Sequence, residues 1–152
     1  MSKSLLVSAA LTALMLVGCG DGRPAVVKTS GQVFLNGEPL IFKGDGFVQV
    51  IPADNRPATG MINPSDGTFT LTTFDNDDGA VPGEHAVTIL VKALGPGGQS
   101  VNLLPTEYTE METSGLTVVI DKPTDSLKIE LEGKMRAAPD STNALRGDAS
   151  GF

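Results

Sequence analysis

Two side chains in this sequence could supply a thiol or an imidazole. Cys19 is the sole cysteine and His85 the sole histidine among 152 residues. A single cysteine excludes an intrachain disulfide framework and a cysteine-based zinc cluster. A single histidine excludes a histidine-rich metal site and disfavours a catalytic dyad. Any chemistry therefore depends mainly on carboxylates, on hydroxyls, or on modification of the one thiol.

The densest group of oxygen ligands is the acidic run Asp75-Asn76-Asp77-Asp78-Gly79. Hard cations such as calcium prefer oxygen ligands, which aspartate-rich loops supply. The run does not follow the EF-hand pattern, because Ala86 occupies the twelfth position, where an acid is required. Gly79 also stands where the third oxygen ligand belongs.

Two interpretations of this run remain. Asp75, Asp77 and Asp78 could form an irregular calcium site completed by Asp66 or Asp45. Alternatively, the run is a solvated loop between strands, whose like charges keep the sheet edge soluble. The sequence favours the solvated loop, and therefore no metal and no cofactor.

His85 follows Glu84 at the start of an expected strand. Adjacent residues of a strand point to opposite faces, so Glu84 is poorly placed to orient the imidazole. Ser65, Ser100 and Ser114 lie in polar loops without a nucleophile-elbow pattern. We therefore predict a surface histidine with satisfied hydrogen bonds, no catalytic residues and no enzyme.

The charge of the chain excludes one class of partner. The formal net charge is −7, so the chain cannot neutralise a phosphate backbone, and we expect no nucleic-acid partner. Arg146-Gly147-Asp148 matches the tripeptide that integrins recognise, but a three-residue match in a polar tail arises easily by chance.

The N-terminus has the pattern of a secretory signal peptide. Lys3 precedes an apolar run over residues 5–17. This run is too short to cross a membrane, which takes about 20 apolar residues, but it has the length of a signal-peptide hydrophobic region. It ends in Leu16-Val17-Gly18-Cys19.

These four residues resemble the lipobox of bacterial lipoprotein precursors. The resemblance implies that Cys19 receives a diacylglyceryl group, that residues 1–18 are removed, and that acyl chains such as palmitate hold the protein in a membrane. Two or three acyl chains anchor a protein stably, whereas one does not. Loss of residues 1–18, which include Lys3, leaves 134 residues and a charge of −8.

This resemblance also fixes the expected location. The protein is expected in the cell envelope, either in the outer membrane or on the outer face of the cytoplasmic membrane. Residues 19–29, rich in Gly, Pro and Asp, are predicted to be a lipidated tether.

The rest of the chain alternates polar and apolar residues with a period of two. Leu127, Ile129 and Leu131 form one inward row, and Val87, Ile89 and Val91 form another. Seven strands are predicted, separated by turn sequences such as Asn36-Gly37; they cover 31–35, 47–51, 57–62, 68–72, 86–91, 116–120 and 127–132. The predicted fold is an all-β, seven-stranded antiparallel sandwich of transthyretin-like or immunoglobulin-like type over residues 30–132.

Three segments in these strands resemble the carboxypeptidase regulatory-like domain, a transthyretin-like sandwich. They are Gly31-Gln-Val-Phe-Leu-Asn-Gly-Glu-Pro-Leu40, Asp66-Gly-Thr-Phe-Thr-Leu71 and Pro82-Gly-Glu-His-Ala-Val-Thr-Ile89. Three further elements are similar to segments of small planctomycete lipoproteins: Thr70-Leu-Thr-Thr-Phe74, Asp78-Gly-Ala-Val-Pro-Gly83 and Thr113-Ser-Gly-Leu-Thr117. The resemblance covers residues 19 to about 132 and implies a secreted, non-catalytic sandwich.

Two further regions carry predictions. Residues 93–115 are the longest irregular connection, and such a loop is often functional or packed as a unit. Tyr108, the only tyrosine, is predicted to bury its ring there and to bond through its hydroxyl. Residues 133–152 lack any period and are predicted to be a disordered tail.

The sequence thus predicts a non-enzymatic envelope lipoprotein with a structural or binding role. One alternative is a module for calcium or envelope polysaccharide that uses the 75–79 and 93–115 loops. Another is an accessory domain that supports a separate secreted enzyme through a protein contact, which rests on fold analogy alone.

Overall fold

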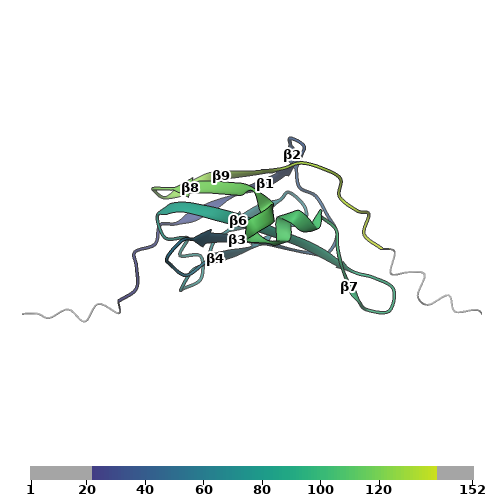
Figure 1. Cartoon of the computed structure of the whole chain (residues 1–152), viewed down its shortest axis with the longest axis horizontal. Coiled ribbons are helices and arrows are strands. Elements are labelled where there is room, and N and C mark those ends of the chain that lie inside the picture. Colours follow the sequence, from purple (N-terminus) through teal and green to yellow (C-terminus); the bar gives the residue numbers. More distant parts are fainter. Residues whose placement is uncertain (1–21, 140–152) are drawn as a thin grey trace, which may run out of the picture.

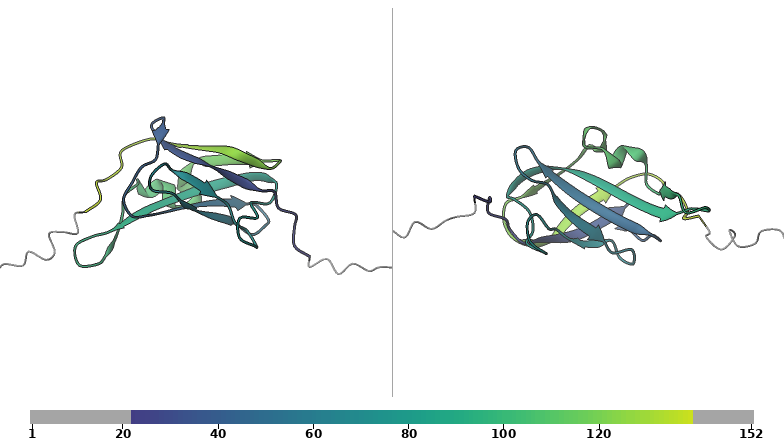
Figure 2. Two further views of the ribbon diagram at one scale, coloured as in Figure 1. Left: turned by 180° about the vertical axis from the view of Figure 1, so that it is seen from behind. Right: turned by 90° about the horizontal axis from the view of Figure 1, so that it is seen from below.

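A computed structural model describes residues 22–139, which fold into two packed β-layers (Figure 1). Strands β1 and β9 belong to one layer, and β3, β4 and β6 to the other (Figures 1 and 2). In chain order the elements are β1 (Thr29–Leu35), β2 (Glu38–Pro39), β3 (Asp45–Pro52), β4 (Ala58–Ile62), β5 (Thr68–Thr70), β6 (Gly83–Leu94), β7 (Ser100–Asn102), the 3₁₀ helix η1 (Thr106–Thr109), α1 (Met111–Ser114), β8 (Leu116–Ile120) and β9 (Thr124–Leu131). The predicted all-β sandwich is confirmed.

All seven predicted strands are present, as β1, β3, β4, β5, β6, β8 and β9. The short strands β2 and β7 extend hairpins at the ends of β1 and β6. The predicted inward row on β6 is confirmed, because Val87, Ile89 and Val91 are all fully buried. On β9, Ile129 and Leu131 are buried as well. Alternating apolar residues therefore supply the core between the layers, as a sandwich requires.

One strand pair departs from the expected antiparallel arrangement. β1 and β9 run parallel, with Gly31 opposite Leu127 and Val33 opposite Ile129. The two strands approach so closely at Gly31 that a Cβ atom there would collide with the Leu127 carbonyl oxygen, so glycine is required at this position. The remaining strand pairs among residues 22–139 are antiparallel.

The 93–115 connection is packed as a unit. Leu103, Leu104 and Tyr108 belong to the buried core, and η1 and α1 give the segment short helical turns. The Tyr108 hydroxyl donates to the Glu132 carbonyl oxygen at 3.0 Å and accepts the Glu132 N–H at 3.0 Å. The predicted role of Tyr108 as a buried, hydrogen-bonded anchor is confirmed.

Residues 22 and 139 leave the domain at opposite ends (Figure 1). Toward the C-terminus, the chain stays in contact with the domain after β9. The Arg136 N–H donates to the Leu103 carbonyl at 2.8 Å, and Met135 packs against the core. The tail expected from residue 133 thus begins with a segment, 133–139, that lies on the sandwich.

Several predictions fall outside the described residues. These are the signal peptide 1–18, the anchor Cys19, the tripeptide Arg146-Gly147-Asp148 and the tail beyond residue 139. Within residues 22–139, no helix has the length and apolar character needed to span a membrane.

Candidate functional site

The acidic loop, residues 75–79, is organised around Asp78. Its Oδ1 atom accepts the Thr73 N–H at 2.7 Å, and its Oδ2 atom accepts the N–H groups of Phe74 at 3.0 Å and Asp75 at 2.9 Å. Burial alone would raise the pKa of the Asp78 carboxyl, but the N–H donors of Thr73, Asp75 and Phe74 together hold it below the ordinary value. This carboxylate is therefore engaged by its own backbone.

The other two aspartates of the loop also have partners within the chain. Asp75 forms an ion pair with Arg23 at 3.5 Å, and the Asp77 N–H donates to Thr72 Oγ1 at 3.0 Å. Asp77 adopts a left-handed backbone conformation with φ of 57°, which aspartate tolerates better than most residues. The loop thus has internal bonds that define its shape.

The residues proposed to complete a calcium site are not grouped with the loop. Among residues 22–139, no three His, Cys, Asp or Glu side chains lie together as a metal site requires. Asp66 instead accepts the Thr68 N–H at 3.0 Å and the Thr68 hydroxyl at 2.7 Å. These two bonds lower the pKa of the Asp66 carboxyl.

Arg23 also places the tether on the domain. Its guanidinium lies 5.5 Å from the centre of the Phe74 ring, and that of Arg56 lies 5.8 Å from it. Val27 forms a two-bond bridge with Ala80, at 2.9 and 3.1 Å. Within the predicted tether 19–29, the part from Arg23 to Val27 therefore lies against the sandwich.

The prediction of a surface position for His85 is wrong. His85 is only 1% exposed, and it shares the inward face of β6 with Val87. Its Nε2 atom lies 2.8 Å from the Val81 carbonyl oxygen, and because a carbonyl only accepts, Nε2 carries the proton. Nδ1 is buried and has no hydrogen-bond partner among the described residues.

Glu84 lies exposed on the opposite face of β6, as the strand geometry predicts. Ser65 and Ser100 are exposed, and the Ser114 hydroxyl accepts the Leu116 N–H at 3.4 Å. His85 thus packs in the core, and within the described part of the chain no serine hydroxyl bonds to it.

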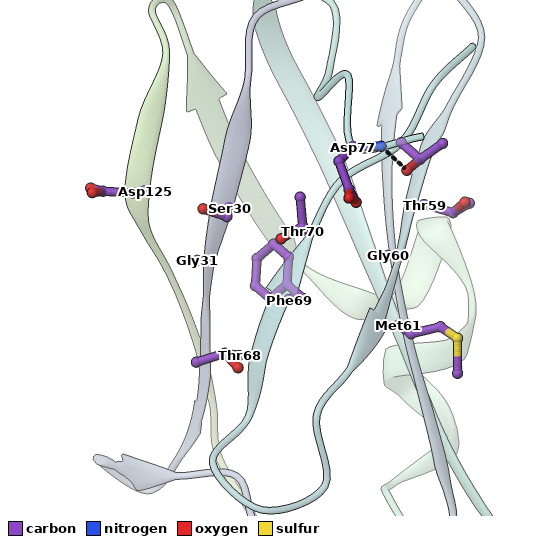
Figure 3. Close-up of a pocket in the computed structure, with 11 residues that line it drawn as sticks. Ser30, Gly31, Thr59, Gly60, Met61, Thr68, Phe69, Thr70, Asp77 and Asp125 are labelled. Carbon is purple, nitrogen blue, oxygen red and sulfur yellow. Dashed lines mark hydrogen bonds between the residues drawn. The ribbon is translucent and has the colours of Figure 1, made fainter. Parts of the chain in front are cut away.

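A hollow of about 620 Å³ lies on the outer face of β1, β5 and β4 (Figure 3). We call it the threonine groove. It is lined by five hydroxyl side chains, which are Ser30, Thr59, Thr68, Thr70 and Thr72. Asp125 of β9 borders one side, Met61 of β4 lines the other, and Asp77 overhangs from the acidic loop (Figure 3).

Strand register explains why these hydroxyls meet. Ser30 lies opposite Thr70, and Thr59 lies opposite Thr72. Thr68 and Thr70 alternate with buried Phe69, so both point outward. The alternation of these threonines with apolar residues is visible in the sequence. Which strands lie next to them, and therefore which hydroxyls they meet, depends on the strand order of the folded sheet.

The groove extends beyond this first hollow. A second hollow of about 510 Å³ shares Ser30, Thr70, Asp77 and Asp125 with it and continues to Lys28. Within residues 22–139, the hydroxyls of Ser30, Thr59 and Thr70 take part in no hydrogen bond. The result is an elongated polar surface with unused donors and acceptors.

No protein-family model, no curated protein and no solved structure matches this chain.

Proposed function

We propose that this chain is a non-enzymatic cell-envelope lipoprotein, held in a membrane through lipidated Cys19, whose sandwich binds a hydroxyl-rich polysaccharide. The anchor is supported by the signal-peptide pattern and by Leu16-Val17-Gly18-Cys19. The observation that carries the binding role is the threonine groove. Hydroxyls both donate and accept hydrogen bonds, and sugar hydroxyls do the same.

The elongated groove suits an extended chain better than a compact ligand. Two adjoining hollows share four residues, so successive sugar units could occupy neighbouring positions. Asp77 and Asp125 could each accept hydrogen bonds from a pair of sugar hydroxyls. Because both are acids in a chain with a net charge of −7, we expect neutral glycans rather than acidic ones.

The proposed anchor gives the domain a defined orientation. Arg23, which is docked on the domain, follows Cys19 by four positions, a reach of roughly 14 Å at most. The N-terminal end of the sandwich would then lie close to the bilayer. The opposite end, with the β7 hairpin and residue 139, would face away from it (Figure 1).

Metabolic labelling with a palmitate analogue tests the anchor. We expect label in the wild type and none in the Cys19→Ala variant. The variant should also leave the membrane fraction, because it lacks the acyl chains that supply the binding energy. A Cys19→Ala protein that still carried label would contradict the proposal.

A glycan array followed by calorimetric titration tests the groove. We expect neutral oligosaccharides to bind the wild type, and the double variant Thr59→Val, Thr70→Val to bind about fivefold more weakly for each lost hydrogen bond. Thr117→Val is the matched control, because Thr117 points outward on β8 and lines neither hollow of the groove. An array without hits, together with no heat on titration, would leave only a structural role.

Calcium is tested in the same calorimeter. We expect no heat on titration with calcium, because Asp78 is engaged by three N–H groups. Heat that disappears in Asp75→Asn would instead support the calcium alternative.

A further inference from the structure

Strand β8 ends a sheet with an unpaired edge. It pairs with β6 from Leu116 to Ile120, and on its other side no strand of the described chain is bonded to it. Beyond the β6 ladder, the backbone of residues 117–120 forms no bond within residues 22–139. An edge of this kind is a ready template for another strand.

The composition of β8 does nothing to prevent such pairing. Its five residues, Leu-Thr-Val-Val-Ile, include no charge and no proline, and three are β-branched and apolar. Proteins usually protect exposed edges with charges, prolines or bulges.

β9 is the neighbouring edge, and it is protected. It carries Asp125, Lys128 and Glu130 on exposed positions, with an ion pair of 3.2 Å between Lys128 and Glu130. Both strands are bonded on one side only among residues 22–139. The lack of charge in β8 is therefore specific to that strand.

β8 also exposes apolar surface. Val119 is 60% exposed on the outer face, and Leu116 and Val118 are only half-buried although they pack against the core. A further strand along β8 would cover all three side chains.

We propose that β8 pairs antiparallel with β8 of a second copy of this chain, about a two-fold axis near Val118. In this register Leu116 lies opposite Ile120 of the other copy, and Thr117 lies opposite its Val119. Inward residues therefore meet inward residues, and outward residues meet outward ones. The isologous contact joins two β3–β6–β8 layers into one continuous sheet.

Charge favours a second copy as the occupant despite the negative net charge. The paired window holds no ionised side chain. The residues that precede β8 in the other copy, Ser114 and Gly115, are uncharged, so Asp121 and Lys122 meet no like charge there. The strand is thus its own complement.

The test is the mass of the full chain in detergent, measured by light scattering over a range of protein and detergent concentrations. We expect a dimer for the wild type. Val119→Lys should weaken the dimer about tenfold or more, because it puts an ammonium group at the new strand pair. Val119→Thr, which keeps the position β-branched and uncharged, should remain dimeric.

A second control separates edge pairing from general surface charge. Ile41 is 61% exposed and lies outside both β8 and the threonine groove, so Ile41→Lys adds the same charge elsewhere and should remain dimeric. Thermal unfolding should show every variant folded, since both positions are exposed. A monomeric wild type, or a Val119→Lys protein as dimeric as the wild type, would overturn the proposal. Neither result bears on the lipid anchor or on glycan binding, which have their own measurements.

Discussion

The acidic loop and the threonine groove are adjacent polar surfaces that use their polar atoms in opposite ways. In the loop, Asp78 accepts three backbone N–H groups and Asp75 pairs with Arg23. In the groove, the hydroxyls of Ser30, Thr59 and Thr70 form no bond within the described chain. Carboxylates that satisfy buried backbone stabilise a fold, whereas unused hydroxyls in a hollow are free for a ligand.

The largest expected effect follows loss of the Asp78 carboxylate. Asp78→Ala leaves the N–H groups of Thr73, Phe74 and Asp75 without their acceptor, and should lower the free energy of unfolding by about 2 kcal/mol. Denaturant unfolding measures this. Asp77→Asn is the control, because the Asp77 side chain accepts none of these bonds and asparagine also tolerates the left-handed backbone at this position. Equal losses in both variants would show that the Asp78 carboxylate stabilises the loop no more than the Asp77 carboxylate does.

The pH dependence of stability is a second test of the contribution of the Asp78 carboxylate. The N–H donors of Thr73, Asp75 and Phe74 hold the pKa of Asp78 in the folded state below the ordinary value of 3.8, so the folded state favours the ionised carboxylate. The resulting stabilisation is complete above about pH 5 and is lost as the pH falls through 3.8 and below. We expect the stability difference between wild type and Asp78→Asn to shrink in that acidic range. A difference independent of pH from 6 to about 3 would argue against a lowered pKa.

A smaller effect is expected where the loop holds the tether. Arg23→Ala removes the ion pair with Asp75 and the contact with the Phe74 ring, and both are solvent-exposed. We expect a loss of about 0.5 kcal/mol. Amide exchange at Val27 and Ala80, which bridge the tether to the loop, should accelerate. Arg56→Ala keeps the tether contacts and serves as the control.

The smallest effect on stability is expected in the groove itself. Thr59→Val and Thr70→Val should change the free energy of unfolding by less than about 0.5 kcal/mol, since their hydroxyls bond nothing in the described chain. The same variants should weaken glycan binding. A large loss of stability would mean that the groove, like the loop, serves the fold.

The sequence predicted much of the architecture because β-structure has a local period. Inward Val87, Ile89 and Val91 and turn-forming Asn36-Gly37 were readable from the order of residues alone. The same period places His85 inward, on the face of Val87. The predicted surface position of His85 was wrong, because the alternation of the strand decides which face a side chain takes and the polarity of the imidazole does not.

Tyr108 shows where residue chemistry alone suffices. A lone tyrosine in a long loop buries its ring and needs one partner for its hydroxyl, and the Glu132 backbone supplies both a donor and an acceptor. Which residue supplies that partner was not predictable, because it lies 24 positions away along the chain.

The sequence by itself determined the strands, the turns, the buried tyrosine and the pattern of the proposed anchor at Cys19. These depend on local periodicity and on short motifs. Tertiary structure alone decided that β1 and β9 run parallel and that hydroxyls from β1, β4 and β5 share one hollow. Each of these depends on which distant strands become neighbours, and packing of the whole core selects that arrangement.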